Sequence, residues 1–373
     1  MPTPPADPPP ATDAARPLIE WFLSAARDLP WRERTTHATP SGRDPYRALV
    51  AEVMLQQTQV SRVVEKLGPF FEAFPTVRAL ASATEAEVMA QWSGLGYYRR
   101  GKNLHRCAQA VVEHHDGEVP ADAGSLRDLP GIGAYTAGAI SSIVFGHPEP
   151  TVDGNITRVL LRLDGIDHAH GSPAAAGYAW ERSAELVRTT DRPGELNEAM
   201  MELGAMVCTP KSPSCAECPL NDICVAHRTG RAEAIPRPKV RAKKKEVFAW
   251  VVHAVAGDRV LVRTRPAKGL WAGLSECPTI ETEADDRPAV LDAVESCDGA
   301  TVRTGTTFAF ATTHRAVTFR VSEVRAHGAA VGTLADMFDG EWLDRGEALA
   351  RGLSSPQRRI IEGGHGSEVG LFS

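Results

Sequence analysis

Apolar residues recur at helical spacing through the first 228 residues of the chain. The segment DPYRALVAEVMLQ has Asp44 as a candidate N-cap and Pro45 at the first helical position, and apolar residues then follow three and four apart. The segments TEAEVMAQWSGLGYYRR and NEAMMELGAMVC show the same spacing, and alternation typical of strands is scarce. The pattern predicts an all-helical domain over residues 18–228.

The pattern changes after residue 228. The segment IPRPKVRAKKKEV contains two prolines, and five Lys or Arg residues stand between Lys239 and Lys245, which is typical of a linker. Beyond it, VFAWVVHAV, DRVLVRTRP and AVTFRVSEV alternate or are rich in β-branched residues, as strands are. The boundaries we expect are a disordered Pro-rich tail at 1–17, the helical domain at 18–228, a linker at 229–246, a smaller α+β domain at 247–350 and a C-terminal tail at 351–373.

Composition and charge narrow the class of protein only slightly. The 373 residues suffice for two domains, and 43% hydrophobic with 24% charged residues is typical of a soluble globular protein. No apolar run is long enough to span a bilayer, and the first residues lack the order of a signal peptide. The net charge of −6 does not favour nucleic acid, but residues 1–245 hold 28 Lys and Arg against 29 Asp and Glu, so the acid surplus lies mainly beyond them. Charge therefore neither supports nor excludes DNA binding.

Four of the seven cysteines follow the pattern C-x6-C-x2-C-x5-C, and they are Cys208, Cys215, Cys218 and Cys224. Four thiolates so close in sequence can surround one metal centre. Zinc sites usually pair two short C-x-x-C knuckles across a longer loop, whereas this spacing is irregular and continuous. The pattern favours a 4Fe–4S cluster with a structural role; zinc and coincident structural cysteines remain as alternatives.

The stretch LPGIGAYTAGAI predicts two helices joined by a tight glycine hairpin. Gly131 and Gly133 permit the turn and let a phosphate approach the backbone closely. The free N–H groups at the start of the following helix favour an anion, so this hairpin can bind a DNA backbone without a positive surface. An ordinary helix–helix turn is the alternative.

Two carboxyl groups are candidates for catalysis. Glu52 has Leu49 and Leu55 three residues to either side, so it lies on a largely apolar helix face, where desolvation raises the pKa of a carboxyl group and keeps it available as a general acid. Asp153 stands just before a helix that begins near Asn155. The alternatives are a partly buried Glu52 satisfied by local hydrogen bonds and an Asp153 that serves only as an N-cap.

Taken together, the motifs show a strong resemblance to a known family. LPWR at 29–32, AEVMLQQTQV, GLGYYRR, LPGIGAYTAGAI, VDGNITRVL, NEAMMELGAMVC and the four-cysteine pattern resemble the MutY-type adenine DNA glycosylases, in the helix-hairpin-helix superfamily that also contains endonuclease III. The resemblance is close over residues 18–228 and looser over 246–350. It implies a helix-hairpin-helix glycosylase domain, a 4Fe–4S cluster on the four cysteines and a Nudix-like second domain.

The resemblance also implies a reaction. Glu52 would protonate the adenine at N7, and Asp153 would stabilise the oxocarbenium-like sugar before water attacks, a division of labour between two carboxyl groups as in glycosidases. Tyr135 and Asn155 would help to set up Asp153 and the water. In relatives that also cut the backbone, the position of Tyr135 is a Schiff-base Lys, so a monofunctional glycosylase is expected.

The family's DNA contacts can be carried over to matching positions. The adenine must be flipped out of the duplex into a pocket, near which the family places residues that match Trp31, Arg32 and Leu55. Gln57 and Tyr97 match positions that wedge into the opened stack, although Tyr97 alone would more often be a core or surface aromatic residue. Thr58, in the same motif as Gln57, is a further expected contact.

The second domain carries one family signature and one departure. GLWAGLSECP, at 269–278, resembles the signature of the domain that recognises 8-oxoguanine opposite the adenine, while the acidic box of a working Nudix hydrolase is absent. Where the family commonly has Phe-Ser-His-x-His, this chain reads FATTH, at 310–314. Thr312 and His314 are the expected contacts here, and strong 8-oxoguanine preference is put in doubt. An insertion at 33–43 has no assignable role.

The sequence therefore predicts a base-excision-repair enzyme, a monofunctional adenine DNA glycosylase. Its expected partner is double-stranded DNA with A·8-oxoguanine or A·G mispairs, and we expect a monomer without membrane contact in a bacterial cytoplasm, associated with the nucleoid through DNA. Two alternatives stay open. One is an endonuclease III-like pyrimidine-damage glycosylase and lyase, which needs Lys at position 135, and the other is a non-catalytic DNA-damage-binding protein.

Overall fold

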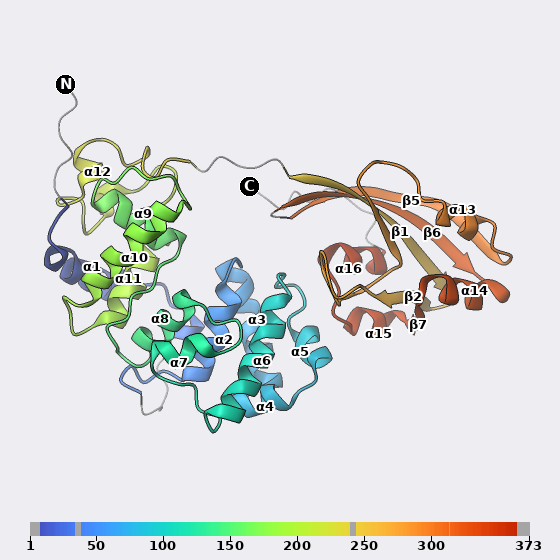
Figure 1. The fold of residues 1–373 in the computed structure, drawn as a ribbon, viewed down its shortest axis with the longest axis horizontal. Helices are drawn as coiled ribbons and strands as arrows, with labels where there is room; N and C mark the ends of the chain where they lie inside the picture. Colours follow the sequence, from blue (N-terminus) through green and yellow to red (C-terminus); the bar gives the residue numbers. More distant parts are fainter. Residues whose placement is uncertain (1–7, 34–38, 239–243, 313, 364–373) are drawn as a thin grey trace. The chain divides into compact units, whose positions relative to one another are not determined.

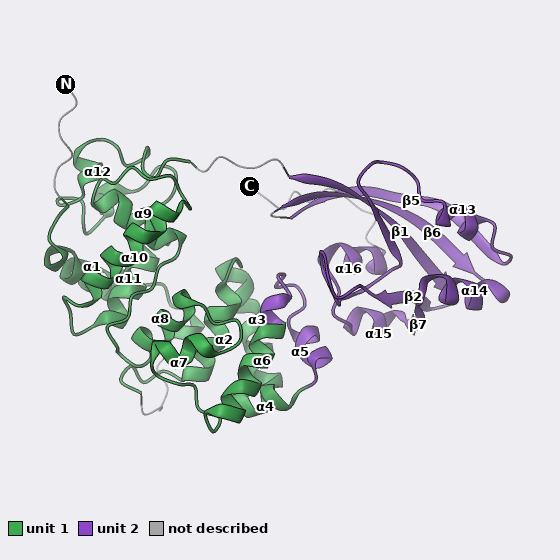
Figure 2. Cartoon of the chain, in the orientation of Figure 1, with its two compact units in different colours: residues 1–83, 102–241 green, residues 84–101, 242–373 purple. Residues whose placement is uncertain are grey.

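The computed structural model describes residues 8–33, 39–238, 244–312 and 314–363 (Figure 1). The chain divides into two units, of which the first comprises residues 1–83 and 102–241 and the second residues 84–101 and 242–373 (Figure 2). None of the described helices is long and apolar enough to cross a membrane.

The first unit is helical, as the sequence predicts. Its elements are α1 (Ala11–Ala25), η1 (Pro30–Arg32), α2 (Pro45–Leu55), α3 (Val60–Ala73), α4 (Val77–Ser82), most of α6 (Arg99–His114), α7 (Ala123–Asp128), α8 (Ala134–Ile143), α9 (Gly154–Leu163), α10 (Pro173–Val187), α11 (Pro193–Met206), η2 (Cys215–Glu217) and α12 (Val225–Arg228).

Local capping places the helices that matter for the site. The side chain of Asp44 accepts hydrogen bonds from the first turn of α2, and Pro45 takes its first position, as expected from the sequence. The side chain of Asp153 caps α9 in the same way. Apolar side chains of α1, α9, α10 and α11 then form a buried core that contains Leu160 and Leu203. These helices are therefore held firmly where they border the site.

The second unit contains a mixed seven-stranded sheet, which confirms the predicted α+β architecture. Its strands are β1 (Lys245–Ala256), β2 (Arg259–Thr264), β3 (Ser275–Glu276), β4 (Thr279–Thr282), β5 (Ala300–Ala311), β6 (Arg315–Ala326) and β7 (Glu341–Asp344). Its helices are α5 (Glu85–Gln91), α13 (Val290–Glu295), α14 (Ala329–Phe338), α15 (Arg345–Ala350) and α16 (Ser355–Glu362).

The sheet runs in the order β3-β2-β1-β6-β5, with β4 on β1 and β7 on β2. Strands β1 and β6 pair in parallel, from Lys245 with Arg315 to Val255 with Arg325, and β5 pairs with β6 as an antiparallel hairpin. One face of the sheet buries residues of α15 and α16 and the other face buries residues of α13 and α14. Because successive side chains of a strand point to opposite faces, the strands contribute apolar residues to both faces of the sheet.

The folded parts extend beyond the boundaries that the sequence suggests. Helix α1 begins at Ala11, inside the expected Pro-rich tail, while residues 1–7 lie outside the described residues. The expected linker begins with a folded segment, because Ile235 is fully buried against Leu161 and Ala226. The expected C-terminal tail contains α16, which Ser354 caps.

Candidate active site

Helices α2, α8, α9 and α11 and the short helix η1 surround a cavity of about 230 Å³ in the first unit. The cavity brings together eight of the residues that the sequence singled out, namely Trp31, Arg32, Glu52, Leu55, Thr58, Tyr135, Asp153 and Asn155. Six others do not line it: Gln57, Tyr97, Gly131, Gly133, Thr312 and His314.

Glu52 extends from α2 into this cavity. Its Oε2 is buried and has no hydrogen-bond partner among the described residues. Burial raises the pKa of Glu52 to about 7; the hydrogen bond with Tyr135 opposes the shift, while the carboxylates of Glu198 and Asp153 add to it. Glu52 can therefore hold a proton near neutrality and has an oxygen free to share it.

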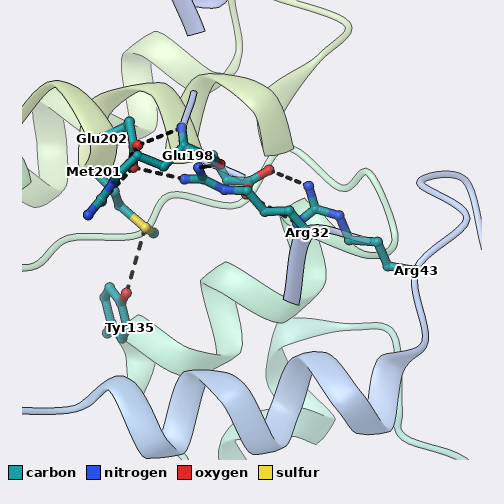
Figure 3. A network of polar contacts seen from close by, with 7 residues as sticks. Arg32, Arg43, Tyr135, Glu198, Met201 and Glu202 are labelled. Carbon is teal, nitrogen blue, oxygen red and sulfur yellow. Dashed lines mark hydrogen bonds and ion pairs between the residues drawn. The ribbon is translucent and has the colours of Figure 1, made fainter. Parts of the chain in front are cut away.

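Tyr135 and Asp153 lie beside Glu52. Tyr135 is in the first turn of α8, and its hydroxyl oxygen lies 3.7 Å from Met201 Sδ (Figure 3). Burial and the carboxylates of Glu52 and Asp153 raise the pKa of Tyr135 well above its usual value, so the phenol stays protonated. Burial also raises the pKa of Asp153, against the opposing hydrogen bonds from the backbone of Ile156 and Asn155.

Asp153 acts as the N-cap of α9 and lines the cavity at the same time. Its Oδ1 accepts a hydrogen bond of 2.7 Å from the backbone N–H of Ile156. The two interpretations from the sequence are thus compatible, because the cap fixes the orientation of a carboxylate that borders the cavity. Asn155, two residues further on, accepts a hydrogen bond of 2.9 Å from Arg158.

Arg158 connects the start of α9 to the cysteine loop, which the sequence did not indicate. It is 5% exposed and donates to Asn155 Oδ1, to the carbonyl of Gly204 at 2.7 Å and to the carbonyl of Cys208 at 2.8 Å. One helical turn later, Arg162 donates to Thr209 and to Cys208 Sγ. Helix α9 therefore anchors the first cysteine and the site residues together.

Two glutamates one turn apart on α11 face three arginines along the wall of the cavity (Figure 3). We call Arg27, Arg32, Arg43, Glu198 and Glu202 the arginine–glutamate network. Arg32 bridges both glutamates, at 3.1 Å to Glu198 and 3.0 Å to Glu202. Arg43 binds Glu198 through both terminal nitrogens, at 2.8 and 3.1 Å, and Arg27 binds Glu202 at 2.7 Å.

The network sets the charge along this wall. Burial alone would raise the pKa of Glu202, but the hydrogen bonds from Arg27 and Arg32 outweigh it and lower that pKa to about 2. Glu198 and Glu202 were not among the site residues expected from the sequence, although two Glu residues at i and i+4 within the apolar segment NEAMMELG indicate a shared helix face. The insertion that ends in Arg43 had no expected role either.

Hydrogen bonds fix the end of that insertion, residues 39–43, within the first unit. Thr39 Oγ1 donates to the carbonyl of Arg43 at 2.8 Å, and Ser41 Oγ donates to the carbonyl of Val144 at 2.9 Å. Residues 34–38 of the insertion lie outside the described residues. The described end of the insertion thus carries Arg43 to the cavity.

The predicted hairpin joins α7 to α8 and is exposed at its tip. Gly131 has a φ of +79°, and a Cβ there would lie 2.6 Å from Asn103 Cβ, so the turn requires glycine. Gly133 stands at the N-cap of α8 with no side-chain cap, which leaves N–H groups of the first turn open to a ligand.

The other predicted DNA contacts are at the surface. Gln57 and Tyr97 are exposed and both have a left-handed backbone, with φ of +56° and +45°. His314 is exposed as well, whereas the hydroxyl of Thr312 binds within its own hairpin, because it accepts a hydrogen bond of 3.0 Å from the backbone N–H of Arg315.

The four cysteines line one pocket together with Arg162. None of them is in a disulfide, and no group of three or more described His, Cys, Asp or Glu side chains is arranged to hold a single metal ion. Four thiols that line one pocket, with the buried guanidinium of Arg162 beside Cys208 Sγ, suit the iron–sulfur cluster that the sequence predicts.

Three segments of the chain match known families. Residues 50–183 match the HhH-GPD superfamily base excision DNA repair protein, residues 208–224 match the iron-sulfur binding domain of endonuclease III, and residues 249–363 match the NUDIX domain. The second match confirms the predicted 4Fe–4S cluster, and the matched segment contains all four cysteines.

The sequences of several relatives align with most of the chain. It is 39% identical over 240 residues to adenine DNA glycosylase of Mycolicibacterium smegmatis, an alignment that covers 64% of this chain and 76% of that protein. It is 34% identical to the Schizosaccharomyces pombe protein of the same name, over 74% of this chain and 71% of that one. The rat protein of that name is 38% identical over 72% of the chain, which spans about 60% of that relative's length.

A solved structure supports the fold of the first unit. A thermostable thymine-DNA glycosylase is 24% identical and superposes with a TM-score of 0.50, covering 59% of this chain and 97% of that one. The similarity shows a common architecture, which confirms the predicted glycosylase fold.

Proposed function

The chain belongs to the adenine DNA glycosylase family, and from that premise we propose that it hydrolyses the N-glycosidic bond of a mispaired adenine in double-stranded DNA. One observation carries the proposal. Glu52 and Asp153, two carboxyl groups with raised pKa values, line the same cavity beside Tyr135.

Glu52 is the general acid of the proposed reaction. Adenine is a poor leaving group until a ring nitrogen is protonated, and the proton must come from a group that still holds it near neutral pH. Burial gives Glu52 a pKa of about 7, and its unpartnered Oε2 is available to donate to adenine N7. The low dielectric of the cavity strengthens that donation.

Asp153 stabilises the sugar as the base departs. Loss of adenine leaves an oxocarbenium-like centre, which a nearby carboxylate stabilises before water attacks. The N-cap bond to Ile156 orients Asp153, and Asn155 is held by Arg158 in the adjacent turn of α9. Tyr135 keeps its proton and cannot form an imine, which supports a monofunctional glycosylase over the pyrimidine-damage lyase.

The walls of the cavity suit a flipped adenine. Trp31 and Leu55 supply apolar surface for its faces, while the arginine–glutamate network offers donors and acceptors to its edge. Extruding a base costs unstacking energy, which contacts within the pocket must offset. The network is already paired, so it meets the base in a fixed arrangement.

We place DNA contacts in each of the two units. The hairpin with Gly131 and Gly133 and the open start of α8 suit a phosphate of the backbone. Gln57 and Tyr97 are exposed, as side chains that enter the opened stack must be.

The second unit is proposed to read the base opposite the adenine, either 8-oxoguanine or guanine. The match to the NUDIX domain and the exposed His314 support this assignment. Because Thr312 Oγ1 is bound to the backbone of Arg315, recognition falls to His314 and the strand end rather than to that hydroxyl.

Cys208, Cys215, Cys218 and Cys224 would hold the 4Fe–4S cluster, which would cross-link their loop when bound. Arg158 links the cysteine loop to the active site, because it donates hydrogen bonds to the carbonyl of Cys208 and to the side chain of Asn155.

Replacing the general acid tests the proposal. Glu52→Gln removes the proton without changing the shape of the side chain, so we expect adenine release to slow at least about 10³-fold while duplex binding is retained. Single-turnover release and gel-shift binding measure the two effects. Glu65→Gln is the matched control, because Glu65 is 61% exposed and pairs with Arg62, which lies one turn earlier on α3. Release by Glu52→Gln at the wild-type rate would contradict the mechanism.

A further inference from the structure

The loop between α5 and α6 presents one exposed tyrosine on a buried base. Trp92, Ser93, Leu95 and Tyr98 are all less than 9% exposed, whereas Tyr97 is 49% exposed. Tyr97 is the one aromatic residue among the large apolar side chains that the described part of the chain leaves exposed. The ring of Tyr97 is therefore accessible, while the side chains on either side of it in sequence are anchored in the fold.

The backbone of this loop is tightly constrained. Gly94, Gly96 and Tyr97 have φ of +89°, +70° and +45°, so a non-glycine residue is held in the left-handed region. Arg100 stabilises this turn from one side: it donates to the carbonyls of Leu95 and Gly96 at 3.2 and 3.3 Å and stands 5.3 Å from the centroid of the Tyr97 ring. The position of Tyr97 is therefore determined by its surroundings.

Residues near the C-terminal end of the second unit hold the other side of the loop. Nη2 of Arg358, on α16, donates to Ser93 Oγ at 3.0 Å and to the carbonyl of Leu349 at 2.8 Å. The hydroxyl of Tyr98 donates to the carbonyl of Leu353. Ser93 and Tyr98 lie on either side of Tyr97 in sequence, and each is thus hydrogen-bonded to a residue more than 250 positions away.

The same helix packs on the strand that leads to the 310–314 loop. Ile360 and Ile361 of α16 lie in the core on one face of the sheet, where Phe308 and Phe310 of β5 pack against it. Arg359 stands 4.7 Å from the centroid of the Phe308 ring. Helix α16 therefore contacts the Tyr97 loop through Arg358 and the β5 strand through the residues that follow.

From these contacts we infer that Arg358 and Tyr98 are positioning residues that hold Tyr97 in the conformation in which it enters the opened base stack, so that α16 joins the stack-opening side chain to the sheet that reads the opposite base. The inference rests on the proposed function, since it assigns Tyr97 to a DNA duplex. Arg358 touches neither DNA nor the reacting atoms in this assignment and acts through the loop.

A double-mutant cycle separates positioning from general stability. Arg358→Ala is expected to slow single-turnover adenine release about tenfold, and Tyr97→Ala to slow it at least as much. If Arg358 acts through Tyr97, the double variant is no slower than Tyr97→Ala alone. A further tenfold loss in the double variant would overturn the inference, because the two residues would then act independently.

Two further variants guard against misfolding. Tyr98→Phe removes only the hydroxyl that binds Leu353 and is expected to slow release in the same direction, by a smaller factor. Arg351→Gln is the control, because Arg351 pairs with Glu341 at the surface of the same unit, and among the described residues none of its side-chain hydrogen bonds or ion pairs is with residues 93–98. We expect it to release adenine at the wild-type rate; a loss equal to that of Arg358→Ala would overturn the inference.

A binding readout distinguishes failure of the inference from failure of the proposed function. With 2-aminopurine next to the mispair and Glu52→Gln as background, Arg358→Ala should lower the fluorescence increase that reports stack opening. If the wild-type protein releases no adenine, the proposed function fails, and hydrogen exchange of amides 93–98 in the free protein decides the inference. Faster exchange in Arg358→Ala than in Arg351→Gln supports it, and equal exchange overturns it.

Discussion

At the residue scale, two glutamates on the wall of one cavity have opposite proton affinities. Burial raises the pKa of Glu52 to about 7, since Oε2 has no partner among the described residues and Glu198 and Asp153 lie near. Glu202 is buried as well, but the guanidinium groups of Arg27 and Arg32 lower its pKa to about 2. The partner, more than burial, decides whether such a group works as an acid or as a fixed charge.

The rate of adenine release should follow the protonation of both catalytic carboxyl groups. Glu52 acts in its protonated form, so the rate falls as pH rises through about 7. Asp153 acts as a carboxylate, and because its pKa is raised, the acid side of the profile begins above the usual Asp value of about 3.9. Single-turnover rates across this range should give a bell-shaped profile. A rate that stays level well above pH 7 would show that Glu52 does not supply the proton.

Glu202 should matter for stability. Glu202→Gln leaves Arg27 without its carboxylate and Arg32 with Glu198 alone, and we expect a loss of about 3 kcal/mol in the free energy of unfolding. The folded pKa of Glu202 is depressed, so this stabilisation is present above its unfolded value and is lost as pH falls through about 2. Urea denaturation measures it, with Glu195→Gln as the control because the Arg192–Glu195 pair is partly exposed. Equal losses in both variants would contradict the network's role.

At the scale of single elements, two helix starts build most of the site. Helix α8 begins at an uncapped glycine and carries Tyr135 in its first turn, and α9 begins at Asp153. Both starts were readable in the sequence, because glycine turns and Asx caps are local signals. The arginine–glutamate network was not readable in the same way, since Arg27 and Glu202 are 175 positions apart and pair only when α1 and α11 pack together.

The two glycines of the hairpin should respond differently to a methyl group. Gly131→Ala meets Asn103 and a φ of +79°, so we expect a loss of stability of about 1–3 kcal/mol. Gly133→Ala has open space and should fold normally, but its methyl group stands at the start of α8, so duplex binding should weaken about tenfold. The loss should be equal for mispaired and fully paired duplexes, because phosphate contacts carry no sequence information. Unchanged binding by Gly133→Ala would remove the hairpin from the DNA contacts.

At the scale of the whole molecule, the units do not follow the order of the sequence. Helical periodicity assigns residues 84–101 to the helical domain, yet they group with residues 242–373. The reason is long-range packing: Tyr98 and Ser93 bind Leu353 and Arg358, partners that no local pattern near residue 93 can indicate. The strands and the α+β architecture, in contrast, follow from local alternation and were predictable.

The central claim is that this cavity removes adenine from mispairs, and one measurement tests it most directly. Single-turnover adenine release is compared for three otherwise identical duplexes, in which adenine faces 8-oxoguanine, guanine or thymine. We expect fast release opposite 8-oxoguanine, slower release opposite guanine and none opposite thymine, with the abasic strand left intact because Tyr135 cannot form an imine. Absence of adenine release from all three duplexes, by protein with its 4Fe–4S cluster in place, would contradict the claim.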